Sequence, residues 1–159
     1  MDIPSTDVSR SNSSEIILTQ AESLTENEPD WVCNAANLSA LLYWSLERIN
    51  WAGFYVFDGK ELVLGPFQGK PACTRIPLGK GVCGTAAQQR RTLVVPNVNE
   101  FPGHIACDTA SQSEIVVPII ANDKLFGVLD IDSPHLARFD AETAQLCESI
   151  VALFVKTME

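Results

Sequence analysis

Apolar residues recur every three or four positions in the segment that follows Pro29, which predicts an amphipathic helix. The positions on its apolar face are Trp31, Ala35, Leu38, Leu42, Leu46 and Ile49. Pro29 suits the first turn of such a helix, because the first helical N–H groups have no acceptor within the helix. We therefore expect a helix that begins near residue 29 and packs one face on a core.

Two pairs of apolar runs are each joined by a short turn, which predicts two β-hairpins. The four runs are WAGFYVF (51–57), ELVLGPF (61–67), EIVVPII (114–120) and LFGVLDID (125–132). Asp58 and Gly59 separate the first pair, and this dipeptide is a strong hairpin signal. Asn122 and Asp123 separate the second pair.

The remaining segments complete the pattern of an α+β domain. Two glycines after Pro77 lead into helix-forming residues, and TLVVP (92–96) predicts a short strand. Residues 97–113 form a polar connection of a length that is usually functional or mobile in compact domains. Asp140 can cap a last helix, whose apolar face holds Leu146, Ile150 and Phe154. Consecutive hairpins combined with helices predict an antiparallel sheet on which the helices pack.

Composition and charge narrow the class of protein. A chain of 159 residues with 46% apolar residues can form one domain with a substantial core. The formal charge of −9 is concentrated in residues 1–30, which hold seven acids and one base. We expect residues 1–28 to form an acidic, flexible tail, with a short helix or an irregular arm at 15–22, and residues 29–159 to form the domain.

The same features exclude some partners. An acidic chain lacks the basic face that nucleic acid requires. The apolar runs are far shorter than the roughly 18 residues that span a bilayer. The polar first residues lack the apolar region of a secretory signal. We therefore expect no nucleic acid, no membrane partner and a cytoplasmic location.

Five cysteines fall into two groups. Cys33 and Cys147 lie in predicted helices, where free cysteine usually acts as a small buried apolar residue. Cys73, Cys83 and Cys107 lie beside glycine, proline or polar residues. No Cys-x-x-Cys pair occurs, so the sequence predicts no metal site. From the residues alone, redox or nucleophilic use and a structural role both stay open for these three.

Cys107 has the setting of a nucleophile, because His104 precedes it by three residues. An imidazole lowers the pKa of a thiol when the fold brings the two together. A solvated loop histidine is the alternative interpretation.

Carboxylates and aromatic residues form a second candidate site. Asp130 and Asp132 are two positions apart on a predicted strand and therefore share a face, and Glu114 opens the partner strand. Clustered acids bind an ammonium group, and one with a raised pKa can donate a proton. Trp51 and Tyr55 flank a glycine and can wall a small pocket. A solvated sheet edge and ordinary sheet packing are the alternatives.

These motifs together resemble one family. WAGFY, LGPFQGKPACTRIPLGKGVCG, FPGHIACDTASQSEIVVPI and GVLDIDS are closely similar to segments of the free methionine-(R)-sulfoxide reductases, over about residues 30–157. The resemblance implies a GAF-like α+β fold, with a six-stranded antiparallel sheet, helices on its faces, and often a homodimer.

The resemblance also implies an activity. It implies reduction of free L-methionine (R)-sulfoxide through a cysteine sulfenic acid and an intramolecular disulfide that thioredoxin recycles, with no metal or organic cofactor. Cys107 matches the catalytic nucleophile, Cys73 the resolving cysteine and Cys83 a third cysteine able to exchange disulfides. The substrate-binding positions that match are Trp51, Tyr55, Glu114, Asp130 and Asp132. The alternative function is a non-catalytic GAF module that binds a small ligand as a sensor.

Overall fold

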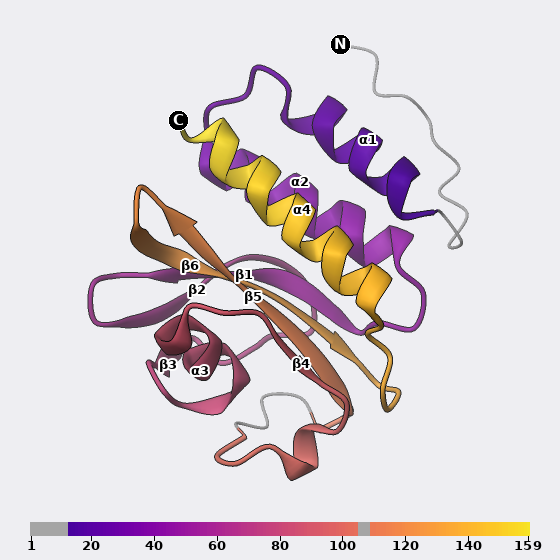
Figure 1. The fold of residues 1–159 in the computed structure, drawn as a ribbon, viewed down its shortest axis with the longest axis vertical. Coiled ribbons are helices and arrows are strands. Elements are labelled where there is room, and N and C mark those ends of the chain that lie inside the picture. Colours follow the sequence, from indigo (N-terminus) through magenta and orange to yellow (C-terminus); the bar gives the residue numbers. More distant parts are fainter. Residues whose placement is uncertain (1–12, 105–108) are drawn as a thin grey trace.

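A six-stranded antiparallel sheet with the strand order β3-β2-β1-β6-β5-β4 lies at the centre of the molecule (Figure 1). The computed structural model describes residues 13–104 and 109–159. The helices are α1 (Ser14–Thr25), α2 (Trp31–Ser45), α3 (Gly81–Gln89), the 3-10 helix η1 (Val98–Glu100) and α4 (Ala141–Thr157). The strands are β1 (Trp51–Phe57), β2 (Glu61–Gly69), β3 (Arg75–Pro77), β4 (Leu93–Val95), β5 (Ser113–Ala121) and β6 (Lys124–Ser133). The predicted α+β class and six-stranded antiparallel sheet are confirmed.

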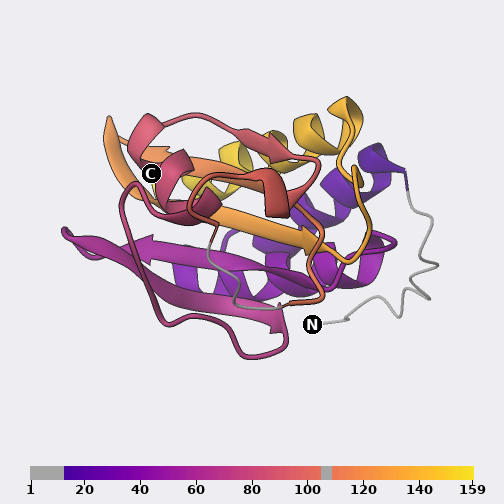
Figure 2. The same ribbon diagram turned by 90° about the horizontal axis from the view of Figure 1, so that it is seen from below.

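Helices cover both faces of the sheet. Helices α1, α2 and α4 lie on one face, and α3 lies on the other (Figures 1 and 2). Alternate residues of β1 serve the two layers: Ala52 and Phe54 pack in the core under α2 and α4, whereas Trp51 and Tyr55 pack in the core with α3. The central strands are nearly continuously apolar because both of their faces are covered.

Both predicted hairpins are present. β1 pairs with β2, and β5 pairs with β6. Strand β2 extends to Gly69, two residues beyond the prediction, and the three-residue strand β3 was not predicted. A run of three residues is too short to carry a period-two signal, so only pairing with β2 defines β3.

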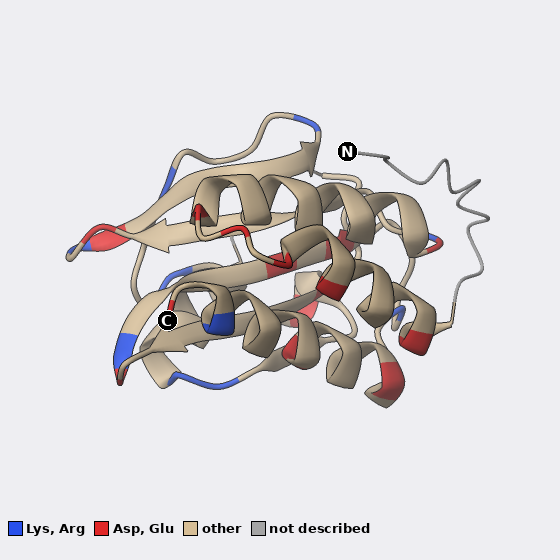
Figure 3. Cartoon of the chain, turned by 90° about the horizontal axis from the view of Figure 1, so that it is seen from above, with Lys and Arg blue, Asp and Glu red and all other residues tan. Residues whose placement is uncertain are grey.

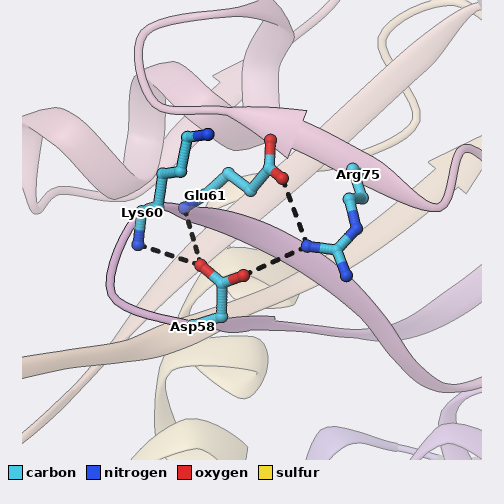
Figure 4. Close-up of polar contacts among 4 residues, drawn as sticks. All are labelled: Asp58, Lys60, Glu61 and Arg75. Carbon is cyan, nitrogen blue, oxygen red and sulfur yellow. Dashed lines mark hydrogen bonds and ion pairs between the residues drawn. The ribbon is translucent and has the colours of Figure 1, made fainter.

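The turn of the first hairpin is tied to β3 (Figure 4). Asp58 Oδ1 accepts hydrogen bonds from the backbone N–H groups of Lys60 and Glu61, both at 2.9 Å. Arg75 on β3 forms ion pairs with Asp58 at 3.1 Å and with Glu61 at 3.2 Å. These exposed ion pairs contribute little stability. They join the hairpin turn to β3, at the point where the chain re-enters the sheet after the loop that holds Cys73.

The short helix that was one of the two expectations for residues 15–22 is present as α1 (Ser14–Thr25), inside the segment expected to form a tail. Its residues Ile17 and Ala21 are buried in the core shared with α2 and α4. Ser13 caps the helix by accepting a hydrogen bond from the N–H of Ile16. Two buried apolar residues four positions apart are too sparse a pattern to predict from the sequence that this helix packs on the domain. The surface on which it packs is provided by α4. Residues 1–12 of the predicted tail lie outside the described residues.

The two long helices begin at aspartates. Asp30 caps α2, so Pro29 precedes the cap instead of lying in the first turn as predicted. Helix α2 ends at Ser45, before the last two residues of the predicted apolar face. Asp140 caps α4 as predicted, accepting a hydrogen bond from the N–H of Thr143 at 2.8 Å.

Acidic residues are spread over the helical layer, seen from above in Figure 3. Within the described ranges, no helix combines the length and the apolar character that a membrane crossing requires.

Candidate active site

Strand register brings the predicted carboxylates together. Asp132 on β6 is paired with Trp51 on β1 and with Glu114 on β5, and Asp130 lies one row further along, opposite Gly53. Paired residues of an antiparallel sheet share a face. All three acids and Trp51 therefore point toward the side of the sheet that α3 covers. The structure thus places the acids inside the domain and not at a solvated sheet edge.

Helix α3 brings Cys83 to this row of acids. Cys83 lies in the first turn of α3 and is 4% exposed, and its Sγ donates to Glu114 Oε1 at 3.7 Å. Close packing of the helix depends on Gly84, because a Cβ at that position would lie 2.3 Å from the carbonyl oxygen of Pro77. The glycine-rich start of the helix therefore allows the thiol to reach the carboxylates.

Aromatic rings wall the site beside the acids. Trp51 stacks between Tyr55, with ring centroids 5.9 Å apart, and Phe67, with centroids 5.2 Å apart. Gly53 makes room for this stack, since a Cβ there would lie 2.3 Å from the Phe67 Cβ and 2.9 Å from the Trp51 ring. Phe67 was not among the predicted site residues. It lies opposite Gly53 only because the pairing of β1 with β2 contains a register shift, which a sequence pattern does not reveal.

The same aromatic residues hold the segment that carries Cys73. Trp51 Nε1 donates a hydrogen bond to the carbonyl of Lys70 at 3.1 Å, and Tyr55 Oη donates to the carbonyl of Cys73 at 2.9 Å. The backbone N–H of Leu64 donates to the carbonyl of Thr74. Cys73 is disulfide-bonded in this structure. Trp51 and Tyr55 therefore do two things: they line the site, and they hold the backbone of the segment that carries Cys73.

A cavity lies among these side chains. The volume inside the cavity that the centre of a water molecule can reach is about 50 Å³. The predicted residues that line it are Trp51, Tyr55, Cys83, Glu114, Asp130 and Asp132. Lys70, Lys80 and His104 also line it, and sequence analysis did not assign the two lysines. Cys107, the predicted nucleophile, lies outside the described residues.

Burial sets the protonation of the acids. Glu114 is 6% exposed and Asp130 is 5% exposed. Burial raises the pKa of Glu114 well above its ordinary value, and the charges of Asp130 and Asp132 raise it further. Burial also raises the pKa of Asp130. Burial of the pair therefore favours a shared proton over two adjacent negative charges.

The neighbouring groups follow the same rule. Burial, followed by the charges of Asp130, Glu114 and Asp132, raises the pKa of the Cys83 thiol well above its ordinary value. Burial and Asp130 likewise raise the pKa of Tyr55. Cys83 is therefore a neutral thiol, whereas an activated nucleophilic cysteine has a lowered pKa.

Two polar atoms at the cavity have no hydrogen-bond partner among the described residues: Oδ1 of Asp130 and Nδ1 of His104. Partial burial lowers the pKa of His104, which favours the neutral imidazole. Unsatisfied buried polar atoms are costly, so their presence at a cavity indicates a site that a polar ligand completes. The acids suit an ammonium group or a metal cation, and the aromatic wall suits a small apolar group.

The two helical cysteines differ from each other. Cys147 is buried as predicted, and burial raises the pKa of its thiol to about 12. Cys33 is exposed, so its predicted burial is wrong. Trp31 and Ala35 belong to the apolar face of α2, and Cys33 lies two positions from each of them. A shift of two positions turns a side chain away from that face of a helix, so Cys33 is exposed.

The fold is that of a GAF domain. The model of the GAF-domain family matches residues 25–157. Comparison with individual proteins narrows the assignment: the chain belongs to the free methionine-R-sulfoxide reductase family within the GAF domains.

Three relatives document this assignment. The free methionine-R-sulfoxide reductase of Saccharomyces cerevisiae is 48% identical over 90% of this chain and 84% of its own length. The free methionine-R-sulfoxide reductase of Escherichia coli is 50% identical over 85% of this chain and 82% of its own length. The structure of the Staphylococcus aureus fRMsr in complex with substrate superposes with a TM-score of 0.89 at 50% identity, covering 97% of this chain and all of that one.

Proposed function

We propose that this protein reduces free L-methionine (R)-sulfoxide to L-methionine, as an oxidoreductase that acts on a sulfur group. The observation that carries the proposal is the set of three acids, of which Glu114 and Asp130 are buried, beside a stacked aromatic wall. Membership of the free methionine-R-sulfoxide reductase family supports it.

The carboxylates account for recognition of a free amino acid. Asp130 and Glu114 are buried and share one proton between them, so one negative charge remains to pair with the ammonium group of the substrate. A methionine residue inside a peptide has no ammonium group, so it would leave these acids unpaired. The rings of Trp51 and Tyr55 pack against the S-methyl group of the substrate.

Reduction begins at the sulfur of the substrate. The thiolate of Cys107 attacks the sulfoxide sulfur while the oxygen takes up a proton. A protonated Glu114 supplies that proton, since its raised pKa favours the protonated form. The oxygen is transferred to Cys107 as methionine leaves, so the sulfoxide is reduced and the cysteine is oxidised to a sulfenic acid.

A second thiol closes the cycle. Cys73 attacks the sulfenic acid of Cys107, which releases water and forms an intramolecular disulfide. Thioredoxin then reduces this disulfide by thiol–disulfide exchange. The ability of Cys73 to be disulfide-bonded supports its resolving role. Cys83 is a second candidate for this role, because its thiol is free and lies in the same cavity.

The remaining features follow the family. We propose that the enzyme works without a metal or organic cofactor, as a homodimer, in the cytoplasm. Thioredoxin is the proposed protein partner.

The discriminating experiment is a coupled assay with thioredoxin, thioredoxin reductase and NADPH. We expect rapid NADPH consumption with the free (R)-sulfoxide and very little with the (S)-sulfoxide. A sulfoxide held in the middle of a short peptide is the matched control and should be inactive. Equal rates on both epimers would overturn the substrate assignment, and no turnover of either would favour a sensor module.

A further inference from the structure

Cys83, Glu114 and Asp130, to which the proposed reaction gives separate roles, also form one set of possible metal ligands. Each residue offers one ligand atom, and the three atoms lie within 4.8 Å of one another. All three side chains are buried. The members of this set lie 31 and 16 residues apart on α3, β5 and β6, and sequence patterns predicted only that the two acids converge.

Spacing between the ligand atoms suits a small tetrahedral cation. Cys83 Sγ and Glu114 Oε1 are 3.7 Å apart. Two such ligands on one tetrahedral zinc ion lie about 3.5 Å apart, given ordinary Zn–S and Zn–O bond lengths. Only a small adjustment of the side chains would bring them to a shared ion.

An independent observation indicates a missing ligand. Oδ1 of Asp130 has no hydrogen-bond partner in the part of the chain that the structure describes, although Asp130 is only 5% exposed and lines the cavity. Neither Asp130 nor Glu114 forms an ion pair with any described lysine or arginine. The cluster therefore lacks the positive charge that normally accompanies buried carboxylates.

We propose that the reduced protein binds one thiophilic divalent cation of the Zn²⁺ class through Cys83, Glu114 and Asp130, with the fourth position open to the cavity. A thiolate and carboxylates suit zinc, whereas Mg²⁺ and Ca²⁺ prefer sites made of oxygen alone. The Cys83 thiol loses its proton to solvent as the Zn–S bond forms, and no electrons are transferred.

Bound zinc would inhibit the enzyme. It occupies the carboxylates that receive the substrate ammonium group, so zinc and sulfoxide exclude each other. This consequence depends on the proposed function, whereas zinc binding itself does not.

The first experiment measures binding directly on the full chain. The protein is reduced with a phosphine, which binds zinc more weakly than dithiols do, and titrated with Zn²⁺ against a chromophoric chelator. We expect one zinc per chain. Titration with Cd²⁺ should give the ultraviolet absorption of a thiolate–cadmium bond.

Variants identify the ligands. Cys83→Ser and Glu114→Gln should each weaken binding by at least about tenfold, since even residues behind the metal ligands change affinity by about 10- to 100-fold. Cys33→Ser removes an exposed thiol and is the matched control. It should bind normally, as should Cys73→Ser and Cys107→Ser. Full binding by both Cys83→Ser and Glu114→Gln, or loss in Cys107→Ser, would overturn the assignment.

Folding and competition complete the test. Circular dichroism confirms that each variant is folded, and the isosteric Glu114→Gln serves if Cys83→Ser is not. In Cys107→Ser, which cannot consume substrate, the (R)-sulfoxide should weaken zinc binding in proportion to its concentration. Zinc binding that the sulfoxide does not affect would overturn the shared site. An active enzyme that binds no zinc would overturn this inference and leave the reductase function standing.

Discussion

Glu114 and Asp130 are two carboxyl groups buried side by side, and no described lysine or arginine forms an ion pair with either of them. Ionised acids in such surroundings are costly, and proton uptake relieves the cost. The same property underlies the two roles proposed for Glu114, as a proton donor and as a cation ligand. The cluster therefore sacrifices stability for binding and chemistry, as functional sites commonly do.

The pH dependence of stability tests the burial of Glu114. Its folded-state pKa lies above the ordinary value of 4.5, so the folded state binds more protons than the unfolded state between the two values. The contribution to stability is fully present below the unfolded-state pKa and is lost as pH rises through the folded-state pKa. We therefore expect Glu114→Gln to lose less stability than the wild type between pH 5 and pH 8.

Chemical unfolding at several pH values measures this difference. Glu22→Gln alters an exposed glutamate on α1 and should leave the wild-type profile unchanged. Parallel profiles for wild type and Glu114→Gln would show that Glu114 is not a buried acid with a raised pKa.

Single-turnover chemistry tests the assignment of the cysteines. Cys107→Ser should release no methionine from the (R)-sulfoxide, because no thiolate attacks the sulfur. Cys73→Ser should release about one equivalent and then recycle poorly with thioredoxin, as expected when only the resolving step is lost. Rapid quenching with chromatography of the amino acid provides the measurement. Normal recycling by Cys73→Ser would assign resolution to Cys83.

Secondary-structure elements act here as positioning devices. The register of β1, β6 and β5 places Trp51, Asp132 and Glu114 in one row. A shift of one residue would turn each of them to the opposite face. Helix α3 then closes over the row and adds Cys83. Four elements from distant parts of the sequence thus build one cluster.

Helix α4 provides a test at the scale of an element. Asp140 Oδ1 accepts a hydrogen bond from the N–H of Thr143, and loss of such a cap costs about 1 kcal/mol. We expect Asp140→Ala to reduce the free energy of unfolding by about that amount. Urea denaturation measures the change. Asp140→Asn retains an oxygen at the cap and is the control; an equal loss in both variants would contradict the capping role.

At the scale of the whole molecule, α1 joins the helical layer on the face opposite the site. Ile17 is 1% exposed and Ile16 is 50% exposed. These neighbouring isoleucines form a matched pair for measuring the contribution of α1. Ile17→Ala should destabilise the protein by about 2 to 5 kcal/mol, and Ile16→Ala by less than about 0.5 kcal/mol.

Thermal and urea unfolding of both variants decide this point. A similar small effect of the two substitutions would show that α1 is not docked in solution. Reductase activity should persist in Ile17→Ala below its unfolding transition, because α1 and the cavity lie on opposite faces of the sheet.

Local patterns in the sequence determined both hairpins, α2, α4 and the α+β class. Period-two alternation, helical spacing, turn residues and caps act over a few neighbouring residues, so the sequence displays them directly. The shared face of Asp130 and Asp132 followed from the same period. The motifs around Cys73, Cys83 and Cys107 determined the family resemblance.

Only the tertiary structure decided which of these residues meet. The docking of α1, the pairing of β3, the contact of Phe67 with Trp51 and the placement of Cys83 against Glu114 all depend on residues distant in the sequence. Burial is also a property of the folded whole, and it is burial that raises the pKa of Glu114 and leaves Asp130 Oδ1 without a partner. The sequence by itself determined which chemical groups are present. Long-range packing turned three of them into a buried site for a cation, because desolvation exists only where the chain closes around them.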